Sequence, residues 1–275
     1  MVGVPKDMAY LHAKKRHHEK ITMLTCYDYP TAVLEDAAGV DIILVGDSLG
    51  TNVLGYDREV SVSLQDMLHH LKAVRRGVRQ SYLLADMPYR TYQTPDMALE
   101  TAQQLQDAGA DGVKFEGVHP EIVQALRARR FEVCGHLGYN PQDHEKAAVQ
   151  GKTRETATKL YHEALQLEQA GLDLLVLELV PEELGRFITE RVTVPTIGIG
   201  GGRYTDGQVL IVNDMLGITP MAFRHSRAFA HVGEAMREAF AAYVTAVQEG
   251  SFPTDDNVRH LARDVYASLQ ESESR

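Results

Sequence analysis

The chain contains 275 residues, of which 44% are hydrophobic and 24% are charged, as in a folded protein with a sizeable core. Its formal net charge of −10 argues against nucleic acid or an anionic membrane as the main partner, because both attract basic surfaces. No apolar stretch reaches the length of a membrane span, so we expect no membrane insertion.

The N-terminal segment, MVGVPKDMAYLHAKKRHHEK, is basic but lacks an apolar core segment, so we do not expect a secretory signal there. We expect about residues 1–20 to form a helical extension. Two cysteines, Cys26 and Cys134, occur without a CxxC motif. This usage fits a reducing cytosol, predicts a cytoplasmic protein and offers no thiolate metal site. We expect both cysteines to be small buried side chains.

Apolar segments typical of buried strands alternate with segments of helical periodicity. The expected strands, in chain order, are 21–28, 41–47, 81–86, 112–116, 131–136, 173–178, 194–199 and 209–214. The expected helices are 29–39, 61–77, 94–109, 153–171, 181–191 and 223–248. Terminal residues support these boundaries: Thr94 stands before Pro95 at a helix start, and several helices end at a glycine just before the next strand.

Near-continuous apolar strands that alternate with helices indicate a parallel sheet covered on both sides. Eight such units without a visible domain break predict an α/β fold, a (β/α)8 TIM barrel forming a single domain over residues 1–275. A doubly wound open sheet is the alternative. The stretch 223–248 has one apolar face, which we expect to pack on the barrel or on a neighbouring subunit. The tail from about 250 to 275 is polar.

Polar side chains stand near the carboxyl ends of most expected strands. In LLVLELVP (174–181), for example, a buried strand would exclude Glu178 unless that carboxylate had a partner or a function. Barrel enzymes carry their chemistry at this end of the strands. We therefore expect an arc of side chains around the barrel mouth: Asp47, Asp86, Glu116, His136 and Glu178.

Alternation along a strand predicts which of these side chains share a face. Val45 shares a face with Asp47, and Lys114 shares one with Glu116, so one register aims the charged residues inward. Two further strand-end acids, Asp28 and Asp214, are expected to have local structural roles.

The acids Asp47, Asp86 and Glu116 with Lys114 would need charge compensation. A divalent ion such as Mg²⁺ supplies it, because hard ions prefer carboxylate and water oxygens. Such an ion can chelate a 2-oxo acid and stabilise the enolate formed when the adjacent carbon loses a proton. Glu178 is the candidate base, since apolar neighbours make a carboxylate a stronger proton acceptor.

Each of these residues also has a structural alternative. A strand-end acid often caps a helix or pairs with a nearby Lys or Arg. Lys114 either pairs with Glu116 or binds the substrate carboxylate, and we favour the second. His136 in CGHLG is either a structural histidine or a site residue, and the flanking glycines favour the site.

In combination, the motifs of this chain resemble those of the ketopantoate hydroxymethyltransferase family over roughly residues 20 to 255. They are TCYDYPTA (25–32), LVGDSLG (44–50), LLADMPY (83–89), VKFEG (113–117), CGHLG (134–138), VQGKT (149–153), LLVLELVP (174–181), IGIGGG (197–202) and TDGQVLIVNDMLGI (205–218). The resemblance implies a barrel of the phosphoenolpyruvate/pyruvate superfamily type. It also implies hydroxymethyl transfer from 5,10-methylenetetrahydrofolate to 3-methyl-2-oxobutanoate, giving 2-dehydropantoate for pantothenate biosynthesis, with Mg²⁺ or a similar ion.

The resemblance implies roles for individual residues. Three positions match metal ligands, with Glu116 acting through water: Asp47, Asp86 and Glu116. Five match substrate-binding positions: Asp47, Ser48, Asp86, Lys114 and His136. Glu178 matches the base that deprotonates the branched carbon of the substrate. The family assembles as a ring of dimers, commonly a decamer, so a homo-oligomer is implied.

Two segments depart from the family pattern. After GHLG the segment YNPQDHEKAAVQG is shorter and lacks a Gly-Gly-aromatic element. Beyond GITP, the segment MAFRHSRAFA replaces one that contains proline and lysine. We expect these differences, at 139–150 and 219–230, to act on the folate side and on closure without reaching the metal or the base.

Two other functions stay open on the sequence alone. A related metal-dependent 2-oxo acid lyase or mutase uses the same barrel, but those enzymes usually rely on a reactive cysteine in a conserved loop. Neither Cys26 nor Cys134 has that setting. A catalytically diverged paralogue would bind metal and 2-oxo acid without exchanging a substrate proton.

Overall fold

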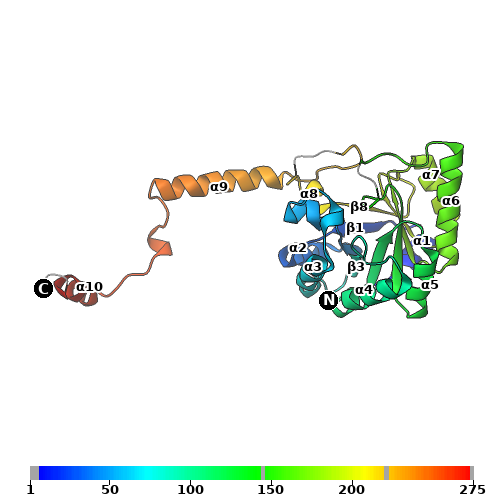
Figure 1. Ribbon diagram of the computed structural model, residues 1–275. Coiled ribbons are helices and arrows are strands. Elements are labelled where there is room, and N and C mark those ends of the chain that lie inside the picture. The colour runs from blue at the N-terminus through cyan, green and yellow to red at the C-terminus, as the bar shows by residue number, and fades with distance from the viewer. Residues whose placement is uncertain (1–5, 144–145, 220–222, 273–275) are drawn as a thin grey trace.

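The computed structural model of the chain describes residues 6–143, 146–219 and 223–272. Its centre is a closed barrel of parallel strands in chain order, in which β8 pairs back to β1 (Figure 1). The strands are Ile21–Thr25 (β1), Ile42–Val45 (β2), Tyr82–Asp86 (β3), Gly112–Glu116 (β4), Glu132–Gly138 (β5), Leu174–Glu178 (β6), Thr196–Ile199 (β7) and Gly207–Leu210 (β8). The closed barrel confirms the predicted (β/α)8 fold and excludes the open sheet.

Helices alternate with the strands and cover the outside of the barrel (Figure 1). They are Met8–Arg16 (α1), Tyr29–Ala38 (α2), Leu64–Gly77 (α3), Pro95–Asp107 (α4), Pro120–Ala128 (α5), Arg154–Gln169 (α6), Glu182–Thr189 (α7), Val212–Met215 (α8), Val232–Gln248 (α9) and Arg263–Ser272 (α10). The predicted start of α4 is confirmed, because Thr94 Oγ1 accepts a hydrogen bond from Met97 N. Within the described ranges, none of these helices has both the length and the apolar character needed to cross a bilayer.

Strand side chains alternate between two apolar layers. On β2, Ile42 and Leu44 belong to the barrel interior, whereas Ile43 and Val45 pack against the helices. Burying each such side chain contributes about 1.5–3 kcal/mol, so the alternation strongly fixes the register of every strand. The interior layer fills the barrel and ends in an apolar floor below its mouth.

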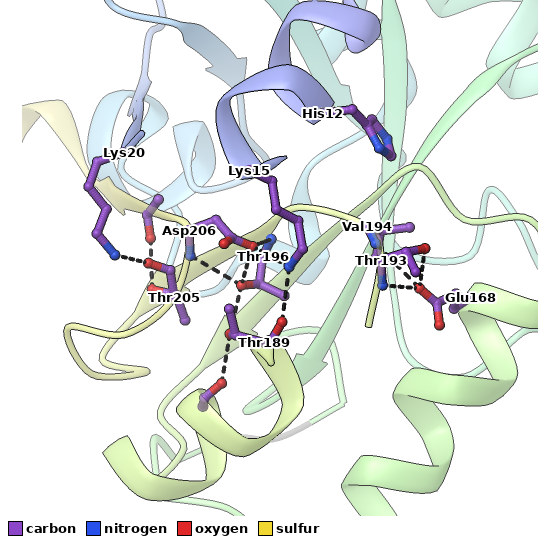
Figure 2. Close-up of polar contacts among 12 residues, drawn as sticks. His12, Lys15, Lys20, Glu168, Thr189, Thr193, Val194, Thr196, Thr205 and Asp206 are labelled. Atoms are coloured by element: carbon purple, nitrogen blue, oxygen red, sulfur yellow. Dashed lines mark hydrogen bonds and ion pairs between the residues drawn. The ribbon is translucent and has the colours of Figure 1, made fainter. Parts of the chain in front are cut away.

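Helix α1 closes the N-terminal end of the barrel. Its residues Met8 and Leu11 belong to the interior apolar layer. Lys15 Nζ donates to Asp206 Oδ2 at 2.7 Å and to the carbonyl oxygen of Thr189 at 3.0 Å (Figure 2). The same Asp206 carboxylate accepts from the backbone N–H of Thr196 at the start of β7. These contacts tie α1 to the strands and leave the carboxyl end for chemistry.

Two predicted boundaries at the C-terminal side are wrong. The strand expected at 209–214 ends at Leu210, and the chain turns into α8 because Val212 N donates to Thr25 Oγ1 instead of extending the ladder. The helix expected at 223–248 begins only at Val232. Before it, Phe229 N donates to the Met215 carbonyl, and Val232 N itself donates to the Leu216 carbonyl, which anchors the start of α9 beside α8.

Helices α9 and α10 extend away from the barrel (Figure 1). The apolar face of α9 is exposed, with Phe240 at 61% and Val244 at 49% of their full accessibility. Its predicted packing on the barrel of the same chain is therefore wrong, and contact with another subunit remains a prediction. Three helices were not expected: α8, where a strand was predicted, α10 in the polar tail, and α5, which Pro120 at its first turn could have indicated.

Asp41 organises the contacts of α1 with the barrel. Its carboxylate accepts hydrogen bonds from Lys14 Nζ at 2.7 Å, from Tyr10 Oη at 2.8 Å and from Thr22 N at 2.9 Å. Burial alone would raise the pKa of Asp41, but these donors and the charge of Lys6 lower it to about 2. A lowered pKa stabilises the fold above the ordinary value of 3.8, and the stabilisation is lost as pH falls toward 2.

We expect Asp41→Asn to lower the free energy of unfolding at pH 7 by about 1–3 kcal/mol, because charge-assisted hydrogen bonds of α1 are lost. It should also flatten the loss of stability between about pH 4 and pH 2. Urea denaturation across this range measures both effects, with Asp256→Asn in the exposed tail as a control. Equal stability of the Asp41 variant and the unmodified chain would contradict this role.

Candidate active site

The strand-end side chains meet at one cavity of about 510 Å³ at the carboxyl end of the barrel. Its floor is apolar and includes Met23, Leu44, Val176 and Val209. The structure brings together all of the predicted site residues around this cavity: Asp47, Ser48, Asp86, Lys114, Glu116, His136 and Glu178. The expected arc at the barrel mouth is therefore present in the fold, while the functional roles of its members stay predictions.

Asp47 reaches the cavity by a different route from the predicted one. Val45 faces the helix layer, so strand alternation would have pointed Asp47 away from the site. The strand ends at Val45, and the turn at Gly46 redirects the chain. A Cβ atom at Gly46 would lie 2.9 Å from Ser48 Oγ and 3.3 Å from Asp86 Oδ2, so a larger residue there would displace the Ser48 side chain. The neighbouring Ser48 Oγ lies 2.9 Å from the hydroxyl of Tyr27.

Asp86 and Lys114 form a buried ion pair. Lys114 Nζ donates to Asp86 Oδ1 at 2.7 Å, and the backbone N–H of Asp47 donates to Asp86 Oδ2 at 3.1 Å. Burial alone would lower the pKa of Lys114, but the charges of Asp86, Glu116 and Asp47 outweigh it and raise that pKa. The ammonium stays charged, and its direct partner is Asp86, a pairing that neither of the two alternatives considered for Lys114 included.

His136 lies between two carboxylates. Its Nε2 is 3.1 Å from Glu178 Oε2, and its Nδ1 is 3.6 Å from Glu116 Oε1. Burial and the charge of Lys114 lower the pKa of His136, but the two glutamates outweigh them and raise it to about 9. The imidazolium form therefore links Glu116 to Glu178 at neutral pH. Glu178 has this cationic neighbour in addition to the apolar ones expected from its strand.

The three acids Asp47, Asp86 and Glu116 crowd one another. Burial and then the charges of Asp86 and Glu116 raise the pKa of Asp47 well above its ordinary range. Burial would also raise the pKa of Glu116, but His136 and Lys114 outweigh it and lower that pKa. Lys114 and His136 thus do not fully offset the negative charge of the three acids, and a bound cation would favour the charged form of Asp47.

The donor chemistry of the cavity fits Mg²⁺, which takes oxygen ligands from one or two carboxylates and fills its octahedron with water and substrate. Asp47 and Asp86 are adjacent carboxylates of this kind. Across the described ranges, no three His, Cys, Asp or Glu side chains converge into a ready-made metal cage. The residues therefore suit an ion that keeps several waters.

The divergent segment 139–150 does reach the acids, contrary to expectation. Gln142 lies within it, is 5% exposed, and places its side-chain Nε2 2.7 Å from Asp47 Oδ2. Its backbone N–H donates to Glu116 Oε2 at 2.9 Å. Sequence reasoning missed Gln142, because a polar residue in a loop has no periodicity that would place it inside a site.

The other divergent segment borders the outer part of the cavity, where Phe223 and His225 contribute to the lining. Asp214 lines the cavity as well and accepts a hydrogen bond from Thr219 Oγ1. Asp214 therefore has the local contact expected of it and also faces the cavity. The expectation for Asp28 is confirmed, since its carboxylate caps α2 by accepting from Thr31 N at 2.8 Å.

Solved structures share this barrel. Phosphonopyruvate hydrolase, described in complex with oxalate and Mg²⁺, superposes with a TM-score of 0.62 at 14% identity and covers 98% of this chain and 96% of its own. 2,3-Dimethylmalate lyase, a member of the phosphoenolpyruvate mutase/isocitrate lyase superfamily, gives 0.59 at 15% identity and covers 97% and 98%. These similarities confirm the barrel fold.

Relatives with much higher identity carry a specific enzyme name. The 3-methyl-2-oxobutanoate hydroxymethyltransferase of Roseiflexus sp. (strain RS-1) is 46% identical over 274 residues, covering 97% of this chain and 98% of the relative. That of Idiomarina loihiensis is 44% identical over 263 residues, covering 94% and 99%. The model of one family, described as ketopantoate hydroxymethyltransferase, matches residues 6–255. The chain is therefore a transferase enzyme and belongs to the ketopantoate hydroxymethyltransferase family.

Proposed function

We propose that the chain transfers a hydroxymethyl group from 5,10-methylenetetrahydrofolate to 3-methyl-2-oxobutanoate, giving 2-dehydropantoate for pantothenate biosynthesis. Family membership supports the reaction. The observation that carries the proposal for this site is the meeting of Asp47, Asp86, Lys114 and Glu178 around one cavity. Binding a 2-oxo acid and removing a proton from its branched carbon calls for this combination of a cation site, a positive side chain and a base.

Substrate binding is assigned to the polar side of the cavity. Asp47 and Asp86 would hold Mg²⁺ or a similar ion directly, and Glu116 would act through water. When bound, the ion supplies Lewis-acid polarisation of the keto and carboxylate oxygens of the substrate. Lys114 adds positive charge beside the substrate carboxylate, and Ser48, held by Tyr27, adds a hydroxyl. The apolar floor accommodates the branched carbon chain.

Proton transfer is assigned to Glu178. Its carboxylate lines the cavity and accepts the proton from the branched carbon, whose electron pair moves into the enolate. The enolate carbon then attacks the methylene carbon carried by folate, and a C–C bond forms as the first C–N bond breaks. Water supplies the hydroxyl oxygen as the second C–N bond breaks, and the two folate nitrogens take up the substrate proton and one proton of the water. His136 Nε2 lies 3.1 Å from Glu178 Oε2 and would position this carboxylate beside the substrate.

The alternative lyase or mutase chemistry lacks its usual reactive cysteine. Both cysteines are buried and unpaired. Burial raises the pKa of Cys134 to about 12 and also raises that of Cys26, so neither forms a thiolate at neutral pH. Unpaired thiols also support the proposed cytoplasmic location.

Product formation tests the proposal directly. Purified protein with Mg²⁺, 3-methyl-2-oxobutanoate and 5,10-methylenetetrahydrofolate should produce 2-dehydropantoate, detected by mass spectrometry. Absence of product from folded, metal-loaded protein would contradict the proposed reaction. Binding of the oxo acid without turnover would instead identify a diverged paralogue.

Glu178→Gln should reduce kcat by about 10²–10⁴-fold, because the amide cannot accept the substrate proton. Binding of Mn²⁺ and of 3-methyl-2-oxobutanoate should stay close to that of the unmodified chain, as measured by calorimetry. Glu183→Gln, on the exposed side of α7, is the matched control and should retain full activity. Turnover at the unmodified rate in the Glu178 variant would remove this residue from the base role.

We also propose that the chain forms a homo-oligomer, with the ring of dimers and the decamer that the family resemblance implies. The support is apolar surface that stays exposed within the described ranges of the chain. On α9, Phe240 and Tyr243 are exposed to 61% and 62%, and on α2 Tyr29 and Leu34 are exposed to 50% and 70%. Apolar surface of this kind marks an interface, and a second copy offers the same surfaces in return.

Introducing charge on α9 should weaken this assembly. The double variant Phe240→Glu/Val244→Glu is expected to sediment at a lower mass than the unmodified chain, because two apolar contacts are replaced by carboxylates that resist burial. Glu238→Gln on the same helix serves as the control and should sediment unchanged. A monomeric unmodified chain, or an unchanged mass for the double variant, would contradict this interface.

A further inference from the structure

We infer that Gln142 is a positioning residue that holds the carboxylates of Asp47 and Glu116 in place for a divalent cation. The inference rests on the proposed function, because it concerns the same cation site. Gln142 lies in the loop that follows β5 and is 5% exposed. It contacts both acids from one side of the cavity, through its side chain and through its backbone.

The two contacts leave Oδ1 of Asp47 for other ligands, whereas Oε1 of Glu116 lies 3.6 Å from His136 Nδ1. The side-chain Nε2 of Gln142 donates to Asp47 Oδ2 at 2.7 Å. Its backbone N–H donates to Glu116 Oε2 at 2.9 Å. Because one residue makes both bonds, the loop sets the position of one carboxylate relative to the other. Both donors are neutral, so they orient the acids without the positive charge that would compete with a metal ion.

The orientation of the Gln142 amide is determined by its surroundings. Its Oε1 accepts a hydrogen bond from the hydroxyl of Tyr92, and its Nε2 also lies 3.3 Å from the carbonyl oxygen of Met87. A flipped amide would place Oε1 against the Asp47 carboxylate and the Met87 carbonyl, where two oxygens would repel. Tyr92 and Met87 therefore aim the donor at Asp47.

Asp47 needs this support more than the other acids do. Asp86 and Glu116 are the last residues of β3 and β4, where the strand ladders fix the backbone. Asp47 lies beyond the end of β2, after the turn at Gly46. Two hydrogen bonds hold Asp47 in the cavity. One comes from the Gln142 side chain, and the other is donated by the backbone N–H of Asp47 to Asp86 Oδ2.

The test measures cation affinity in the absence of substrate. We expect Gln142→Met, which keeps the length and apolar volume but removes the amide, to weaken Mn²⁺ binding by about 10–100-fold in an EPR titration. Gln150→Met is the matched control, because Gln150 lies in the same segment and its amide donates to the carbonyl oxygen of Ala148 at 3.2 Å. That variant should bind Mn²⁺ as the unmodified chain does.

A second variant keeps the test independent of folding defects. Tyr92→Phe retains the ring and removes only the hydroxyl that orients the amide, so Mn²⁺ binding should weaken in the same direction but less. Unchanged affinity in both Gln142→Met and Tyr92→Phe, with an active unmodified chain, would overturn the inference and leave the proposed function intact. An unmodified chain that neither binds Mn²⁺ nor forms product would overturn both.

Discussion

The structure of the site depends on one electrostatic constraint, the burial of several carboxylates at the same barrel mouth. Asp47, Asp86 and Glu116 are each 3–4% exposed, and their mutual repulsion is only partly offset by Lys114 and His136. Burying like charges this closely costs free energy unless cations and hydrogen-bond donors compensate. This unfavourable free energy is concentrated at the carboxyl end of the barrel, where a divalent ion and an oxo acid would complete the charge balance.

The rest of the fold serves this arrangement. Parallel strands deliver side chains from several turns of the chain to one end of the barrel, and the apolar interior excludes water beneath them. Helix α1 seals the opposite end through Met8, Leu11 and the Asp41 contacts. The proposed reaction follows from the contrast between a charged wall and an apolar floor, because the substrate has a charged oxo acid end and a branched hydrocarbon end.

Strand periodicity was enough to predict the barrel and most of the arc, since Glu116 and Glu178 end strands whose inward faces follow simple alternation. It failed at Asp47, where a turn at Gly46 replaces the strand. It could not find Gln142, whose role depends on a loop folding back over the acids. The sequence also predicted the apolar face of α9, but it could not show that this face stays exposed in the described part of the chain.

The most direct measurement of the central claim is hydrogen exchange at the branched carbon of 3-methyl-2-oxobutanoate in deuterated water, without folate. The account predicts that the unmodified protein incorporates deuterium at that carbon when Mg²⁺ is present and much more slowly when the ion is chelated. Such exchange requires a base and a cation acting together on the 2-oxo acid. No exchange by folded protein with Mg²⁺ and bound substrate would contradict the account.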